Sequence, residues 1–142
     1  MTGSNAVTAT GRWQMVAALA LATLGAGFHH TRAIPATTPL VFEMVAIWLP
    51  ALVLGVWWIL RPGPTAKWAI IVWALLNLVL GAYGRAYESP ANQTLHLVYA
   101  LTQIPVLIVA YRSQPTRKLT IALVAVAVVA SVLLVVPQLN GR

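Results

Sequence analysis

Three histidines and two carboxylates are the side chains of this sequence best suited to acid–base chemistry or metal binding. His29 and His30 are adjacent, Glu43 follows them, and Glu88 comes shortly before His96. Imidazole suits zinc, copper and iron, and a carboxylate can complete such a site. Adjacent residues of a helix project about 100° apart, so a site would combine one of the paired histidines with His96 and a carboxylate. Ligation of a heme by two histidines is a second possibility, because the spacing of the histidines does not distinguish a heme from a bare metal ion.

Three polar residues inside or at the edge of apolar stretches are candidates for binding a ligand or moving a proton: Glu43, Asn77 and Gln103. An ionisable residue at the centre of a membrane span costs about 2.5 kcal/mol or more. Asn77 and Gln103 are expected at one depth on neighbouring helices, where a bond between their carboxamides would contribute about 0.6 to 2 kcal/mol. Each of these residues also has a structural interpretation. Glu43 could form an ion pair with Arg32 or Arg85, and Asn77 and Gln103 could serve only to hold two helices together.

The remaining side chains give little support for catalysis. The chain has no Cys, and its two acidic residues are both Glu, which excludes a disulfide scaffold, thiolate ligands and a Ser-His-Asp triad. The segment Gly25-Ala26-Gly27 lies inside an apolar stretch and follows no strand, so it is no phosphate-binding loop. We therefore expect no catalytic activity of the chain's own.

The elements that must position these residues follow from the composition. Of 142 residues, 60% are hydrophobic and 8% are charged, whereas a soluble domain carries about 25% charged residues. Five apolar stretches each approach the roughly 20 residues that span a bilayer, and lipid offers no partner for open backbone, which favours helices. The sequence predicts an all-α membrane protein, one transmembrane domain over residues 1–142, folded as a compact bundle of five helices with short loops at about 13–30, 40–60, 68–85, 95–111 and 119–139.

Two prolines fall inside the predicted second and fourth helices. Pro50 and Pro105 each remove a backbone donor, so a kink is expected at both positions. The connections between stretches are short and contain Pro and Ser, as at Ser89-Pro90. Connections this short place consecutive helices side by side and antiparallel. Kinks can open a cavity between such helices.

The basic residues predict how the helices are oriented in the membrane. The net charge is +7, but the cations are spread over the ends of apolar stretches and form no basic face, so no nucleic-acid partner is expected. The larger set, on the side of the N-terminus, predicts a cytoplasmic N-terminus and an external C-terminus. The small size and short loops favour a bacterial inner membrane. That larger set is Arg12, Arg61, Lys67, Arg112, Arg117 and Lys118, against Arg32, Arg85 and Arg142 on the other side. A cleaved signal segment stays open for the first stretch, which would leave four helices.

Aromatic residues mark the same two boundaries. Amphipathic rings prefer the headgroup level of a membrane. The predicted inner boundary carries Trp13, Trp57, Trp58, Trp68 and Tyr111. The predicted outer boundary carries Phe28, Phe42, Tyr83 and Tyr87. Three aromatic residues lie deeper and are not explained by anchoring: Trp48, Trp73 and Tyr99.

Three functions from different classes follow. The tiny loops and apolar helices favour a non-catalytic subunit or assembly partner of a larger membrane complex, in contact with the lipid bilayer and with another membrane protein or further copies of itself. The first alternative is a small-ligand binding or transport protein with an intrabundle cavity near Pro50, Asn77, Gln103 and Pro105. The second is a metal- or heme-binding subunit that uses the His and Glu residues of the external side. The sequence names no cofactor.

Overall fold

The computed structural model describes residues 9–32, 44–87 and 89–113, together with residues 121, 125 and 128. Every element in these parts is helical, so the prediction of an all-helical chain is confirmed for them. The elements are α1 (Ala9–Arg32), the π-helical turn η1 (Met44–Trp48), α3 (Leu49–Leu60), α4 (Pro64–Tyr87), α5 (Pro90–Leu101) and α6 (Ile104–Ser113). Residues 121, 125 and 128 are also helical.

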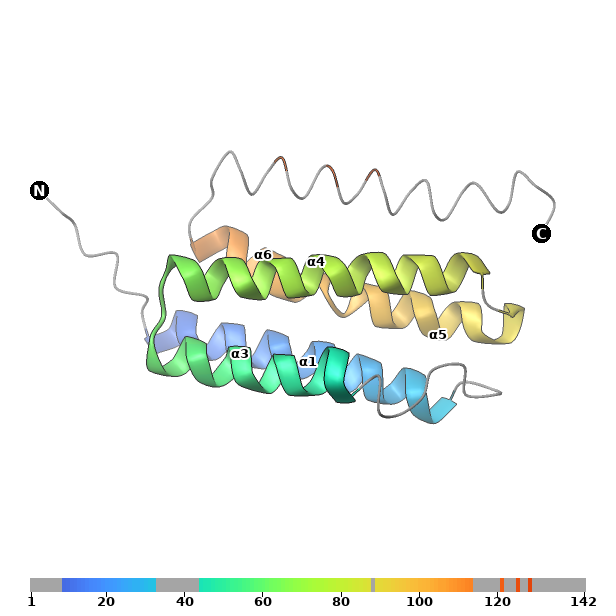
Figure 1. The fold of residues 1–142 in the computed structure, drawn as a ribbon, viewed down its shortest axis with the longest axis horizontal. Coiled ribbons are helices and arrows are strands. Elements are labelled where there is room, and N and C mark those ends of the chain that lie inside the picture. The colour runs from blue at the N-terminus through green and yellow to red at the C-terminus, as the bar shows by residue number, and fades with distance from the viewer. Residues whose placement is uncertain are drawn as a thin grey trace, which may run out of the picture.

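The described elements form a bundle in which consecutive rods run in opposite directions (Figure 1). α1 runs one way, η1 and α3 return, α4 runs forward again, and α5 with α6 returns as one interrupted rod. α1 packs against α3, α5 and α6, and α4 packs against the same three helices. The rods therefore close a ring with α1 diagonally opposite α4, and the interior of this ring is shared by all of them.

Prolines stand at the beginnings of these helices. α4 begins at Pro64 and α5 at Pro90, while Pro50 and Pro105 are the second residues of α3 and α6. Pro64 and Pro90 are accommodated because the first turn of a helix has no intrahelical acceptor for their N–H, whereas Pro50 directly follows the helical turn η1. In place of smooth kinks, the backbone therefore changes helix type before Pro50, at η1, and breaks before Pro105, where the Gln103 N–H turns back to the carbonyl of Ala100 at 3.1 Å.

The core is built from small and apolar side chains. Ala18, Ala22 and Ala26 recur at intervals of four along the buried face of α1, and Ile70 and Ala74 are fully buried on α4. Alanines at this spacing bring backbones close, as in helix interfaces within membranes. Larger side chains are buried in the same core, among them Trp58, Trp73 and Tyr99.

Two helical segments of the described chain are long and apolar enough to cross a membrane. They are Pro64–Gly84, within α4, and Asn92–Ser113, which runs through α5 and α6; Leu49–Leu60 is apolar but shorter. α1 has sufficient length, but Arg12, Gln14, His29 and His30 lower its mean hydropathy. The five-span arrangement thus stays a prediction, and most of the fifth stretch, 119–139, lies outside the described residues.

Candidate functional site

Polar side chains lie inside the bundle. Six polar or charged residues of the described chain are buried: His29, Lys67, Asn77, Asn92, His96 and Gln103. Buried polar groups are costly unless they are hydrogen-bonded, so their contacts identify the candidate site. Four residues contributed by α1, α4 and α5 form what we call the inner polar cluster: His29, Asn77, His96 and Tyr99.

A pair of histidines joins α1 to α5 at one side of this cluster. The Nε2 atom of His29 lies 3.1 Å from the Nε2 atom of His96, across 67 residues of sequence. The ring centroids are 4.2 Å apart and the planes are tilted by 58°, and only 4% of His29 and 7% of His96 is exposed. If both rings are neutral, one Nε2 donates and the other accepts, so the two rings hold different tautomers.

Tyr99 and Asn77 continue the cluster toward the middle of the bundle. Tyr99 follows His96 by three positions and so lies on the same face of α5, with its ring centroid 6.3 Å from that of His29. The Tyr99 hydroxyl donates to the Asn77 side-chain oxygen, and the Asn77 amide donates to the carbonyl of Trp73 at 2.8 Å. Both ends of the Asn77 carboxamide are therefore occupied.

Glycines on α4 make room for the cluster. A Cβ atom at Gly84 would collide with the His96 ring, and one at Gly81 would lie 2.9 Å from the Ala100 Cβ atom. Real Cβ atoms essentially never approach other atoms so closely. These two glycines therefore let α4 and α5 pack tightly enough for α5 to hold His96 and Tyr99 against the interior.

Gln103 lies apart from this network. It is fully buried at the break between α5 and α6, its amide donates a long bond of 3.4 Å to the Thr102 hydroxyl, and its Oε1 atom has no hydrogen-bond partner among the described residues. The predicted bond between Asn77 and Gln103 is not formed. Asn77 is hydrogen-bonded instead to Tyr99, which precedes Gln103 by four residues, and to the carbonyl of Trp73.

The structure brings together only part of the set that the sequence singled out. His29 and His96 meet, whereas Glu43, Glu88 and the side chain of His30 lie outside the described residues. Within the described chain, no group of three or more His, Cys, Asp or Glu residues could hold a metal ion. Tyr99 was missed as a site residue, although its unexplained depth and its spacing from His96 are signals that could have found it.

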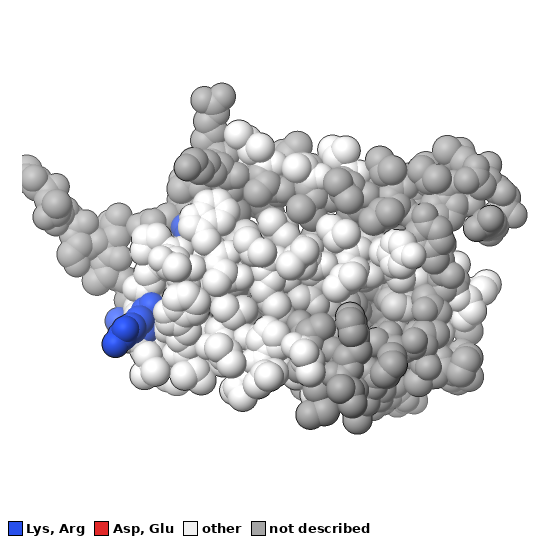
Figure 2. Space-filling view, in the orientation of Figure 1, with Lys and Arg blue, Asp and Glu red and all other residues white. Residues whose placement is uncertain are grey.

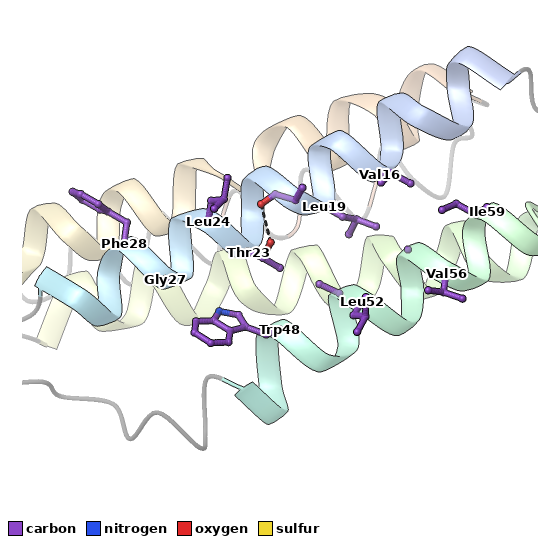
Figure 3. Close-up of a pocket in the computed structure, with 13 residues that line it drawn as sticks. Val16, Leu19, Thr23, Leu24, Gly27, Phe28, Trp48, Leu52, Val56 and Ile59 are labelled. Atoms are coloured by element: carbon purple, nitrogen blue, oxygen red, sulfur yellow. Dashed lines mark hydrogen bonds between the residues drawn. The ribbon is translucent and has the colours of Figure 1, made fainter.

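A surface groove with a volume of about 730 Å³ lies between α1 and α3 (Figure 3). Leu19, Leu24, Leu52 and Val56 are among its apolar lining residues. The hydroxyl of Thr23, also in the lining, bonds to the carbonyl of Ala20 at 2.7 Å. Asn77 and Gln103 do not line this groove, although η1 and α3, the helix that contains Pro50, form one of its walls.

Comparison with known proteins finds no matching family model, no matching curated protein and no matching solved structure. The function must therefore be inferred from the geometry.

Proposed function

We propose that this chain is an integral membrane protein that acts as a non-catalytic helical subunit or assembly partner of a larger membrane complex. The observation that carries the proposal is the distribution of side chains. Apolar groups cover the outside of the bundle, and the polar groups described above are inside it. In a water-soluble protein the distribution is the reverse, with polar side chains outside and apolar side chains inside.

Large apolar side chains are exposed on every helix of the ring. Leu24 of α1 is 70% exposed and Leu60 of α3 is 72% exposed, and Leu76 of α4 and Ile108 of α6 also face outward. Where Figure 2 draws described residues, the face is almost all uncharged, and the blue atoms gather at one end. Soluble monomers rarely expose contiguous apolar patches beyond a few hundred Å². Contact with lipid tails removes the free-energy cost of this surface.

The two ends of the bundle differ in charge, and this supports an orientation. Four basic residues lie at one end of the bundle, where α1 begins, α3 ends, α4 begins and α6 ends: Arg12, Arg61, Lys67 and Arg112. Among the described residues, the opposite end carries only two basic positions, at the ends of α1 and α4. The positive-inside rule assigns the more basic end to the cytoplasm. We therefore propose a cytoplasmic N-terminus, and the small size and short loops favour a bacterial inner membrane.

Aromatic residues accompany the basic end. Trp13 and Trp57 are exposed there, Trp68 is half-buried, and Tyr111 is exposed one residue before Arg112. Indole and phenol rings prefer the interface between lipid tails and headgroups. Their position agrees with an interface that crosses the bundle at this level.

The role as a subunit is supported by the groove between α1 and α3. Its lining includes four small residues, Ala20, Gly27, Ala51 and Gly55. Small residues are enriched where membrane helices pack, since backbones can approach closely there. The alternative of ligand transport through the interior has less support, because Asn77 already donates to the carbonyl of Trp73 and accepts from Tyr99.

The experiment is purification from native membranes in mild detergent, followed by identification of stoichiometric companions. We expect a defined complex that Gly27→Leu or Gly55→Leu weakens, because either leucine fills the groove. Val72→Leu is the matched control, because Val72 is exposed on α4 and does not line the groove. Purification of the wild-type chain as a lone monomer, or a complex that survives both leucine substitutions unchanged, would contradict the proposal.

A further inference from the structure

The facing imidazoles of α1 and α5 have the separation of two ligands of one metal ion. In a tetrahedral site each zinc–nitrogen bond is 2.0–2.1 Å, which places two imidazole nitrogens about 3.3 Å apart. The Nε2 atoms of His29 and His96 are 3.1 Å apart, and the rings, whose centroids are 4.2 Å apart, would turn outward to direct both lone pairs at the ion. Both nitrogens are the atoms that imidazole uses for metals.

We propose that His29 and His96 bind one divalent transition-metal ion, of the class Zn²⁺, Co²⁺, Ni²⁺ or Cu²⁺, and that the ion bridges α1 and α5. Imidazole selects these ions over Mg²⁺ and Ca²⁺, which prefer oxygen. Two histidines leave coordination positions that water would have to fill. The site is independent of the subunit role and would stand if that role failed.

Binding of the metal ion to the two histidines moves one proton within one ring. In the metal-free pair, one Nε2 atom carries the proton of the shared hydrogen bond. Metal binding requires a lone pair on both Nε2 atoms, so that ring moves its proton to Nδ1 by tautomerisation. No net proton, electron or leaving group is transferred, and both imidazoles stay neutral.

Heme is a poorer fit to the same pair. Two histidines on opposite faces of a heme iron stand about 4 Å apart with the macrocycle between them. Here the rings are in direct contact at a tilt of 58°, and Gly84 packs directly against the His96 ring. The pair thus favours a bare ion over a porphyrin.

The proposal is tested on the full-length chain in detergent, without a polyhistidine tag, after chelator treatment. Titration with Co²⁺ is followed by visible absorption, and titration with Zn²⁺ by calorimetry. We expect about one ion per chain. His29→Gln and His96→Gln should each weaken binding more than about 100-fold, since even outer partners of a ligand cost 10–100-fold.

His30→Gln is the matched control. Adjacent positions of a helix differ by about 100° around its axis, so this variant at the position after His29 should bind as the wild type does. Because a variant at either buried histidine risks misfolding, Cu²⁺ bound to the wild-type chain is also examined by electron paramagnetic resonance. Hyperfine splitting from imidazole nitrogen is the expected signature.

Three results would overturn the proposal. The first is the absence of saturable Co²⁺ or Zn²⁺ binding, together with a Cu²⁺ spectrum that lacks nitrogen splitting; His29 and His96 then form only a structural hydrogen bond. The second is binding that persists in folded His29→Gln and His96→Gln chains. The third is binding that is lost in His30→Gln alone.

Discussion

The Tyr99 hydroxyl of α5 donates a hydrogen bond to the side-chain oxygen of Asn77 on α4, and this bond joins the two most closely packed helices of the bundle. Asn77 in turn donates to the carbonyl of Trp73 on its own helix. The arrangement satisfies a carboxamide that would otherwise be buried at a cost.

We expect Tyr99→Phe to destabilise the bundle by about 1–2 kcal/mol, because it leaves the buried Asn77 oxygen unsatisfied. Thermal unfolding in detergent measures the effect. Tyr111→Phe is the control, since Tyr111 is exposed on α6 and makes no described hydrogen bond. Equal stability of the two variants would show that the bond contributes nothing.

A second expectation concerns Gly84. Replacing a helical glycine with alanine ordinarily stabilises a helix by up to about 1 kcal/mol. Gly84→Ala should instead destabilise the fold by about 1–3 kcal/mol, because the new methyl group overlaps the His96 ring. Gly55→Ala provides the contrast, since its Cβ atom would meet Leu19 at an ordinary 3.7 Å. If Gly84→Ala raises the melting temperature as Gly55→Ala should, the close approach of α4 and α5 is wrong.

We expect a substitution of Gln103 to stabilise the bundle, whereas Tyr99→Phe should destabilise it. Its buried Oε1 atom accepts no hydrogen bond in the described chain, and an unsatisfied buried acceptor costs about 1–3 kcal/mol. Gln103→Met keeps the length of the side chain and removes this cost, so the variant should melt at a higher temperature than the wild type. A marked fall in melting temperature would mean that Gln103 has a stabilising polar contact.

Much of the helical layout was predictable from apolar runs and prolines. Pro64 and Pro90 stand at helix starts because their missing N–H is harmless there. The contact of His29 with His96 was not predictable, since it depends on how α1 and α5 are rotated about their axes. The prediction for Asn77 and Gln103 shows the same limit. Their expected equal depth suggested a hydrogen bond between them, but the Asn77 oxygen accepts a hydrogen bond from Tyr99 instead.

The reversed distribution of polar and apolar side chains is tested most directly by cysteine labelling, since the chain has no native Cys. Single variants at three exposed positions sample the two ends and the outer face: Thr65→Cys at the basic end, Ser89→Cys at the opposite end and Leu76→Cys midway along α4. With a membrane-impermeant maleimide on intact bacteria, we expect Ser89→Cys to react at once, Thr65→Cys only after permeabilisation, and Leu76→Cys in neither case. Rapid labelling of Leu76→Cys in permeabilised cells would place water against the apolar face and contradict the membrane account.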